Sequence, residues 1–311
     1  MTADRRPPTA AAGGRGQGAG KSGLPPEPET WNLEPAPAVT ELRPRPVLKW
    51  AGGKGRLLPE LLALLPGDFS GYHEPFIGGG ALFFALAAGG RLRPAYLSDA
   101  NPALIDVYTA LREGVEGVIA ALREHRYERD HYYRVRAQRP EELSLAERAA
   151  RVIYLNKTCY NGLYRENRAG QFNVPFGRYA NPTICDEPNL RAAAAVLQGV
   201  DLAQRPFPTV LDVAKAGDFV YFDPPYVPVS ATANFTAYNR HGFGPDDQRR
   251  LRDVFAALAE RGVRAMLSNS DTPFVRELYA GFRVEQIFAA RAVNSKANGR
   301  GKVAEVLVMN Y

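Results

Sequence analysis

Four consecutive residues, Asp223, Pro224, Pro225 and Tyr226, could together bind an amino group attached to an aromatic ring. The two prolines have no backbone N–H and fix two φ angles, so the turn is rigid and presents acceptors, namely the Asp223 carboxylate and backbone carbonyls. The lone pair of such an amino group is delocalised into the ring. Acceptors for both of its N–H bonds would help to localise that lone pair for attack, while Tyr226 could stack on the ring. The alternative is a structural turn, but its carboxylate would then need buried partners.

A second candidate site surrounds the glycines Gly78–Gly80, which separate the apolar run Tyr72–Phe76 from the apolar helix Ala81–Ala88. Glycines at a strand-to-helix turn let a ligand approach the backbone at the carboxyl edge of a sheet. Phe83 stands where the dinucleotide fingerprint has its third glycine, so that fingerprint is incomplete. Asp99, at the end of the next apolar run, is placed to accept hydrogen bonds from ribose hydroxyls. The pattern favours adenosine-type binding, with a packing turn and a helix cap as the alternative.

Short apolar runs alternate with helix-like stretches from Val47 onward, which is typical of an α/β fold. The predicted strands are Tyr72–Phe76, Ala95–Ser98, Phe219–Phe222, Ala265–Ser268, Arg283–Ala289 and Ala304–Asn310. The predicted helices include Gly55–Leu65, Ala81–Ala88, Pro102–Arg112 and Pro245–Arg261. The connection between the last two strands has no helical pattern, so we predict an antiparallel pair at the edge of a mostly parallel sheet.

Residues 105–205 carry few strand signals and several helical ones, such as Leu145–Leu155 and Asn189–Leu197. We therefore predict a mainly helical insertion in the sheet domain. Basic residues interleave with tyrosines in its segment 151–179, a combination that fits phosphate contact and base stacking. A solvated basic helix face with core tyrosines is the alternative. The residues concerned are Arg151, Lys157, Arg165, Arg168 and Arg178, with Tyr154, Tyr160, Tyr164 and Tyr179.

The composition of the chain excludes several classes of protein. The 311 residues include 39 Lys and Arg against 33 Asp and Glu, and the net charge of +6 favours an anionic partner. The two cysteines, Cys159 and Cys185, exclude a disulfide framework, and no residue cluster has metal-ligand spacing. Neither a long apolar run nor a secretory signal is visible, so we expect a soluble, cytoplasmic protein.

Residues 1–46 are rich in proline, glycine and alanine and show no apolar periodicity, which predicts a disordered tail. Within it, Gly20-Lys21-Ser22 resembles the end of a phosphate-binding loop. Arg15 stands where that motif requires glycine, and no strand precedes it. A nucleotide hydrolase built on this loop is therefore excluded.

The turn Asp223–Tyr226 resembles the DPPY signature of amino-group methyltransferases. Further segments resemble one family of them, the Dam-type (D12 class, alpha-group) DNA adenine N6-methyltransferases, and the resemblance extends over residues 47–311. The segments that carry it are Leu48–Lys54, Glu74–Gly80, Leu97–Asn101, Tyr160–Arg165, Phe172–Tyr179 and Ser230–Tyr238.

The resemblance implies a Rossmann-like, S-adenosylmethionine-dependent methyltransferase sheet with an inserted, mainly helical target-recognition domain. It implies S-adenosyl-L-methionine as the methyl donor and adenine N6 in duplex DNA, reached after base flipping, as the acceptor; no metal is implied. By resemblance, Asp223, Pro224, Pro225 and Tyr226 are catalytic. The cofactor-binding residues that it implies are Trp50, Ala51, Gly52, Lys54, Glu74, Phe76, Gly78, Asp99, Phe207 and Asp223.

The resemblance also implies contacts to DNA, and it leads to GATC as the hypothesised recognition site. By resemblance, Tyr160 and Asn161 fill the space beside the displaced base. Leu163, Arg165 and Pro175 read base edges, and Lys49 and Tyr179 read a further guanine. The same catalytic turn could instead act on cytosine N4, on adenine in other DNA sites or in RNA, or persist in a catalytically silent DNA-binding relative.

The expected organisation follows from these assignments. Residues 47–104 and 206–311 would form the catalytic domain, and residues 105–205 the recognition insertion. We expect residues 234–243 to form a mobile loop that orders over the flipped base, and residues 296–302 to touch phosphate. The expected partner is double-stranded DNA, not a membrane, in the cytoplasm or, in a bacterium, at the nucleoid. One adenine needs only a monomer, although a palindromic site would accept two copies, and the enzyme could act alone or in a restriction–modification pair.

Overall fold

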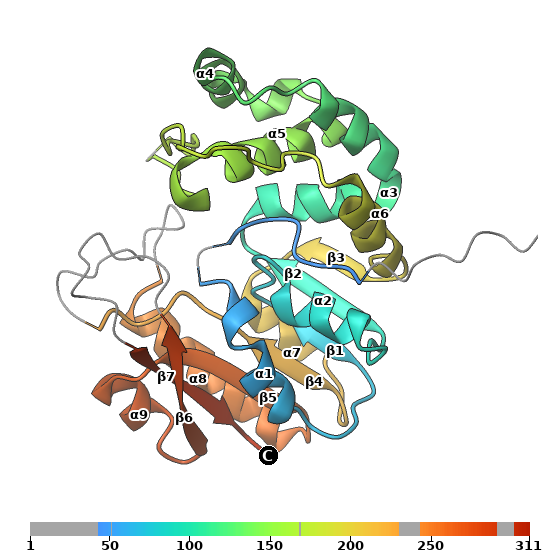
Figure 1. The fold of residues 1–311 in the computed structure, drawn as a ribbon. Coiled ribbons are helices and arrows are strands. Elements are labelled where there is room, and N and C mark those ends of the chain that lie inside the picture. Colours follow the sequence, from blue (N-terminus) through green and yellow to red (C-terminus); the bar gives the residue numbers. More distant parts are fainter. Residues whose placement is uncertain (1–42, 51, 168, 230–242, 291–301) are drawn as a thin grey trace, which may run out of the picture. The chain divides into compact units, whose positions relative to one another are not determined.

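One seven-stranded sheet organises the residues that the computed structural model describes, which are 43–50, 52–167, 169–229, 243–290 and 302–311. The strand order is β3-β2-β1-β4-β5-β7-β6 (Figure 1). Strands β1 to β5 pair in parallel, whereas β7 is antiparallel to both β5 and β6. The strands are β1 (Tyr72–Glu74), β2 (Ala95–Asp99), β3 (Asp201–Gln204), β4 (Phe219–Phe222), β5 (Arg264–Ser270), β6 (Arg283–Ala290) and β7 (Lys302–Met309).

The sheet topology confirms the predicted α/β class, with a mostly parallel sheet and an antiparallel edge pair. β1 lies between β2 and β4, so the strand order reverses there, and the crevice at the carboxyl ends of such strands is a usual ligand site. The sequence pattern does not predict β3. This edge strand is short, pairs only with β2 and is not fully buried at any position, so it lacks an apolar run.

Different helices cover the two faces of β4. Phe219 and Tyr221 belong to a core shared with α1 and α2, whereas Val220 and Phe222 belong to a second core with α7, α8 and α9. Successive side chains of a strand point to opposite faces, so burial on both faces explains why all four residues are apolar or aromatic. The helices are α1 (Leu58–Ala63), α2 (Ala81–Ala88), α7 (Val210–Val213), α8 (Pro245–Glu260) and α9 (Pro273–Leu278).

Four helices follow β2 and precede β3 in the chain, and Figure 1 shows them together beyond that end of the sheet. They are α3 (Pro102–Arg123), α4 (Arg129–Ala137), α5 (Leu145–Thr158) and α6 (Glu187–Val196). The Asn101 side chain caps α3, and Ser144 forms a capping box with Glu147 at the start of α5. The predicted helix Pro102–Arg112 is too short, because α3 continues through a kink at Gly114.

Four short 3₁₀ turns connect these elements: η1 (Lys54–Arg56), η2 (Pro140–Glu142), η3 (Tyr160–Gly162) and η4 (Phe207–Thr209). The predicted helix Gly55–Leu65 is replaced by η1 followed by the shorter α1. Of the predicted tail, only residues 43–46 are described, and there the Arg45 backbone exchanges two hydrogen bonds with Asn189 of α6. None of the described helices is both long and apolar enough to cross a membrane.

Candidate active site

The turn that follows β4 places the Asp223 carboxylate at the carboxyl edge of the sheet, between two donors. Asp223 Oδ1 lies 2.6 Å from the Lys54 ammonium and accepts a hydrogen bond of 2.9 Å from the Ser268 hydroxyl of β5. The side chain of Asp223 is 22% exposed, and that of Lys54 only 5%. The carboxylate is therefore held by neighbouring elements while one side stays open to a ligand.

Lys54 shows which kind of group this site favours. Its Nζ donates to the Gly52 carbonyl at 2.7 Å and lies 4.6 Å from the centroid of the Tyr226 ring. A carboxylate, a carbonyl and an aromatic face thus surround one nitrogen, a set that stabilises a group with positive charge or polarised N–H bonds. The structure thus brings together four of the predicted site residues, Gly52, Lys54, Asp223 and Tyr226.

Tyr226 is fixed at its hydroxyl as well as along its backbone. The hydroxyl donates to Glu305 Oε2 of β7 at 2.9 Å. Burial, together with the charges of Asp223 and Glu305, raises the pKa of Tyr226 well above its ordinary value, so the hydroxyl stays protonated and remains a donor. The ring therefore has a defined orientation beside Asp223.

Two side chains that the sequence analysis missed hold the backbone of the same turn. Gln248 of α8 donates to the Pro225 carbonyl at 2.9 Å, and Asn269 of β5 accepts from the Val227 amide at 3.0 Å. A signal for Asn269 was present, because Ser268-Asn269-Ser270 ends a buried strand with polar residues. No such signal marks Gln248, because a polar residue near the start of a helix usually faces water.

The glycine loop after β1 lets Trp50 approach the backbone closely. A Cβ on Gly78 would lie 2.7 Å from Trp50 Cδ1, and a Cβ on Gly79 would lie 3.1 Å from Trp50 Cβ. Gly78 and Gly80 also have positive φ angles of 46° and 67°, which side chains disfavour. The predicted residues Trp50 and Gly78 are therefore in contact.

Asp99 lies at the end of β2 beside this loop. Its carboxylate accepts hydrogen bonds from the backbone amides of Gly78, at 3.2 Å, and Asn101, at 2.9 Å. Burial nevertheless raises the pKa of Asp99 to about 6. Asp99 thus links the glycine loop to the start of α3 and is ionised at neutral pH.

Glu74, at the end of β1, is the most strongly perturbed carboxyl of the site. It is only 2% exposed and accepts a 2.7 Å hydrogen bond from Tyr72. Burial, with a contribution from the negative charge of Asp223, raises the pKa of Glu74 to about 8. The carboxyl therefore carries a proton at neutral pH, and a cation bound nearby would favour its ionised form.

Three phenylalanines form an aromatic cluster next to these carboxyls. The rings of Phe76 and Phe207 stack with centroids 5.4 Å apart, and Phe243 packs edge-on against Phe76 at 5.8 Å. Arg250 lies over the Phe207 ring at 5.8 Å. Phe207 is brought beside Phe76, and flat apolar faces of this kind suit an adenine ring.

The predicted DNA-contacting residues, apart from Lys49, belong to a second region, residues 160–179 without residue 168, which we call the recognition segment. Tyr160 is 52% exposed, and Asn161 has a φ of 57°, which makes it the only described non-glycine residue with positive φ. The Tyr160 amide donates to the Pro175 carbonyl at 2.9 Å, so Tyr160, Asn161 and Pro175 lie together. Exposed Arg165 donates to the Asn173 side chain at 2.7 Å.

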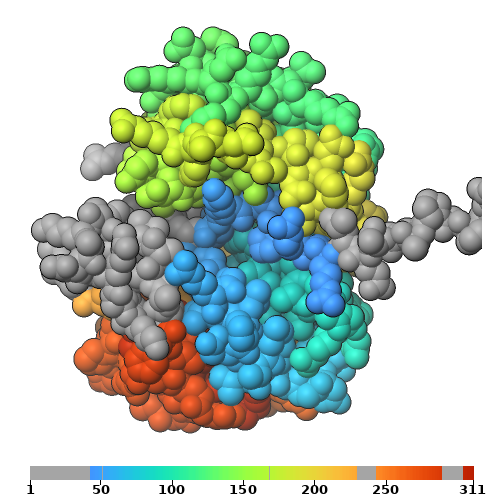
Figure 2. Space-filling model, in the orientation of Figure 1, coloured from blue at the N-terminus to red at the C-terminus, as the bar shows by residue number. Residues whose placement is uncertain are grey.

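Lys49 joins the recognition segment to the sheet. Its ammonium lies 4.6 Å from the centroid of the Tyr179 ring, so the structure brings this predicted pair together. Asn156 of α5, 1% exposed and missed by the sequence analysis, accepts from the Lys49 amide and donates to the carbonyls of Lys49 and Gly162. In Figure 2 the segment around residue 50 (blue) accordingly lies against the green and yellow helical residues. Leu163, the remaining predicted contact, is half-buried next to Gly162.

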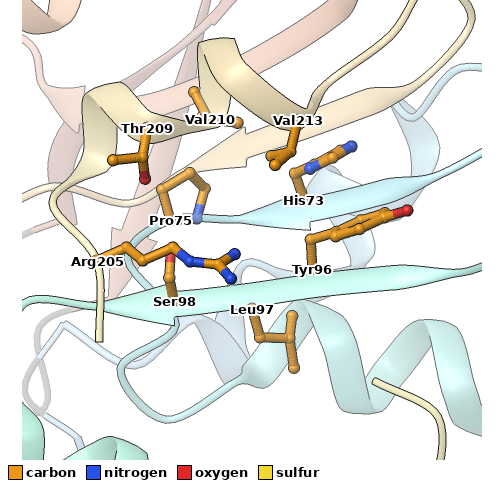
Figure 3. A pocket seen from close by; sticks show the side chains of 9 residues that line it. All are labelled: His73, Pro75, Tyr96, Leu97, Ser98, Arg205, Thr209, Val210 and Val213. Atoms are coloured by element: carbon orange, nitrogen blue, oxygen red, sulfur yellow. The ribbon is translucent and has the colours of Figure 1, made fainter. Parts of the chain in front are cut away.

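A small, partly open pocket lies between β1, β2 and α7 (Figure 3). His73 borders it, stacks on Tyr96 and pairs through Nε2 with Asp218 at 2.9 Å. Burial lowers the pKa of His73, which keeps the imidazole neutral at pH 7. None of the predicted site residues lines this pocket, so the candidate active site is the open edge at Asp223.

Some predicted features lie outside the described residues. These are Ala51, most of the loop 234–243 and residues 296–301. Among the residues that the structure describes, no group of three or more His, Cys, Asp or Glu side chains could hold a metal ion.

Comparison with known proteins gives a single, consistent family. Residues 50–293 match the family model of the D12 class N6 adenine-specific DNA methyltransferases. The chain is 42% identical to a type II methyltransferase from Lactococcus lactis subsp. cremoris, over 86% of this chain and 95% of the relative. It is 40% identical to a type II methyltransferase from Methanocaldococcus jannaschii, over 86% and 99%. It is 34% identical to the DNA adenine methylase of Escherichia coli K12, over 85% and 95%.

Proposed function

The chain belongs to the D12 class of N6 adenine-specific DNA methyltransferases, and from that premise we propose that it methylates adenine N6 within GATC in duplex DNA, with S-adenosyl-L-methionine as donor. The observation that carries the catalytic part is the environment of Lys54 Nζ. A carboxylate, a carbonyl and the Tyr226 ring converge on a nitrogen there. The N6 amine of a flipped adenine requires the same three kinds of contact.

The residues at the carboxyl ends of β1 and β2 fit the cofactor. Asp99 would accept hydrogen bonds from the ribose hydroxyls, while the cluster of Phe76 and Phe207 would offer an apolar face to the adenine ring. Glu74, buried and protonated, would be ionised by a nearby positive charge and would then stabilise it. Trp50, Gly52, Lys54 and Gly78 complete this group of proposed contacts. When bound, S-adenosylmethionine supplies an electrophilic methyl group on a cationic sulfur.

The role of the catalytic turn is mainly to position the amine. The Asp223 carboxylate and the Pro224 carbonyl would accept the two N–H bonds, which directs the nitrogen lone pair at the methyl carbon. Tyr226 would stack on the adenine from one side. Lys54 would withdraw from the acceptor set as the base enters, and Asp223 would stabilise the positive charge that develops on the amine.

The recognition segment supports the proposed DNA site. The target nucleotide must leave the stack, at a cost of a few kcal/mol. Exposed Tyr160 and neighbouring Asn161 would fill the space that it vacates. Arg165 would read a guanine through O6 and N7, the commonest specific arginine contact. Leu163 and Pro175 would meet neighbouring base edges, while Lys49 and Tyr179 would read a further guanine.

We further propose that one copy of the enzyme acts on one adenine, so that a palindromic site accepts two copies in turn or together. The proposed place of action is the DNA of the cytoplasm, where no partner restriction enzyme is required for the reaction. Residues 47–104 and 206–311 would serve catalysis together with β3 of the sheet, and the helical part of residues 105–205 would serve recognition.

The deciding experiment measures transfer of a labelled methyl group from S-adenosylmethionine to duplexes that contain GATC or GTTC, and to single-stranded RNA of matched sequence. We expect transfer to the GATC duplex alone, and none with the Asp223→Ala variant. Transfer to duplexes without GATC would discard the recognition assignment and keep the chemistry. Transfer to RNA, or none despite cofactor binding in calorimetry, would overturn the proposed substrate.

A further inference from the structure

A chain of buried amides lies behind the catalytic turn and takes no direct part in the proposed mechanism. Gln248 of α8 is 2% exposed, and Asn269 of β5 is fully buried. They bond to each other at 3.1 Å, and each bonds to the backbone beside Tyr226. We call these two side chains the amide clamp.

The direction of every hydrogen bond in the amide clamp is fixed. The backbone amides of Val227 and Ser270 can only donate, and both point at the same atom of Asn269, which must be Oδ1. Asn269 Nδ2 is therefore the donor to Gln248 Oε1, which leaves Gln248 Nε2 to donate to the Pro225 carbonyl. The chain accordingly has one consistent arrangement of donors and acceptors, and neither amide can flip without losing bonds.

The two prolines explain why the turn needs such a clamp. Pro224 and Pro225 have no N–H, so neither peptide can be anchored through an amide donor. The amide clamp instead bonds the Pro225 carbonyl on one side of Tyr226 and the Val227 amide on the other. With the Tyr226–Glu305 bond, three elements (α8, β5 and β7) fix the orientation of one residue.

We propose that Gln248 and Asn269 are positioning residues for methyl transfer, which align the Pro224 carbonyl and the Tyr226 ring with Asp223. This proposal rests on the proposed function of the same site. Both side chains are buried behind the turn, so their loss should reduce kcat and leave binding nearly intact. Misplacement of reacting groups by about 1 Å can cost about 100-fold in rate.

The variants Gln248→Met and Asn269→Ala test the proposal in the full-length protein. Gln248→Met keeps the length of the side chain but removes its hydrogen bonds. Asn310→Ala is the matched control, because Asn310 makes two bonds to backbone at the opposite end of β5, to the Ala265 amide and the Val263 carbonyl. We expect the two clamp variants to lose about 30- to 100-fold in kcat. KM for the duplex should change less than about threefold, and kcat of the control should stay unchanged.

Hydrogen exchange provides a readout that does not depend on the substrate. The Val227 amide should exchange faster in both clamp variants and at the unchanged rate in Asn310→Ala. Unchanged kcat in Gln248→Met, or an equal fall in kcat in the control, would overturn the proposal. Absence of transfer to DNA by the unsubstituted protein would overturn the proposed function instead. In that case, unaltered Val227 exchange in the variants would also overturn the clamp, and faster exchange would support it.

Discussion

The catalytic turn and the recognition segment hold their functional side chains in opposite ways. Asp223 lies among a buried ammonium and a buried hydroxyl, and Tyr226 is fixed by residues from α8, β5 and β7. Arg165, by contrast, is exposed and bonds only locally in the described structure, to Asn173 eight positions away. Asp223 and Tyr226 are thus held by distant parts of the fold, whereas Arg165 is held only within its own short segment.

The difference follows from what each region must do. Hydrogen bonds to buried charged groups contribute about 1.5–3 kcal/mol, and their geometry is set before a substrate arrives. Exposed polar pairs contribute about 0–1 kcal/mol, so Arg165 can exchange Asn173 for a base edge at little cost. Catalysis benefits from fixed geometry, whereas sequence reading requires side chains that change partners.

The largest expected effect tests the catalytic turn. Asp223→Asn keeps the shape of the side chain but loses the charge that faces Lys54. We expect kcat to fall about 10²- to 10³-fold, as for loss of one electrostatic contact in a preorganised site. Single-turnover transfer measures this loss, and binding of the duplex in a gel-shift assay is the control. A loss of less than tenfold would contradict the catalytic role of the carboxylate.

The next largest effect tests the recognition segment. Arg165→Ala should cost about 1–3 kcal/mol of discrimination at one base position and relax the preference there. Asn173→Ala removes only the resting partner, so it should alter discrimination by less than about 1 kcal/mol. Competition between duplexes that differ at single positions measures both. A uniform loss of transfer across all duplexes would show that Arg165 does not read a base.

The smallest effect concerns pH and Glu74, the buried carboxyl at the end of β1. Folding raises the pKa of Glu74 from 4.5 to about 8, so between these values the folded protein holds a proton that the unfolded chain releases. The free energy of unfolding should therefore decrease as pH rises from 4.5 to 8, by at most about 1.4 kcal/mol per pH unit for this group. Glu74→Gln should flatten that slope in urea unfolding at pH 6 and 7. Parallel slopes in the two proteins would exclude Glu74 as the cause.

Sequence patterns predicted what depends on neighbours in the chain. The buried run of β4 and the prolines after it located the catalytic turn, and Gly78 with Asp99 located the edge next to it. Gln248, Asn269 and Asn156 were missed because a buried amide acquires meaning only through partners distant in the sequence.

Secondary structure was misjudged where a local signal conflicted with packing. α3 continues past Gly114 because Val118, Ile119 and Leu122 bury its second half, although the glycine itself leaves the helical region with a φ of −166°. β3 forms because β2 offers it a free edge, not because its own residues are apolar. Tertiary context overrides propensity at both places.

The position of β7 has a consequence for the order in which the protein folds. During synthesis β7 leaves the ribosome after every other described element, yet it lies inside the sheet between β5 and β6 and supplies Glu305 to Tyr226. The central pair β1–β4 is also distant in sequence, with the paired residues Tyr72 and Phe219 separated by 147 positions. Strands that are so far apart in the sequence pair slowly, because closing the loop between them costs entropy before the new contacts compensate for it. A nascent chain would therefore complete its helical segment early and its catalytic edge only after β7 has been synthesised.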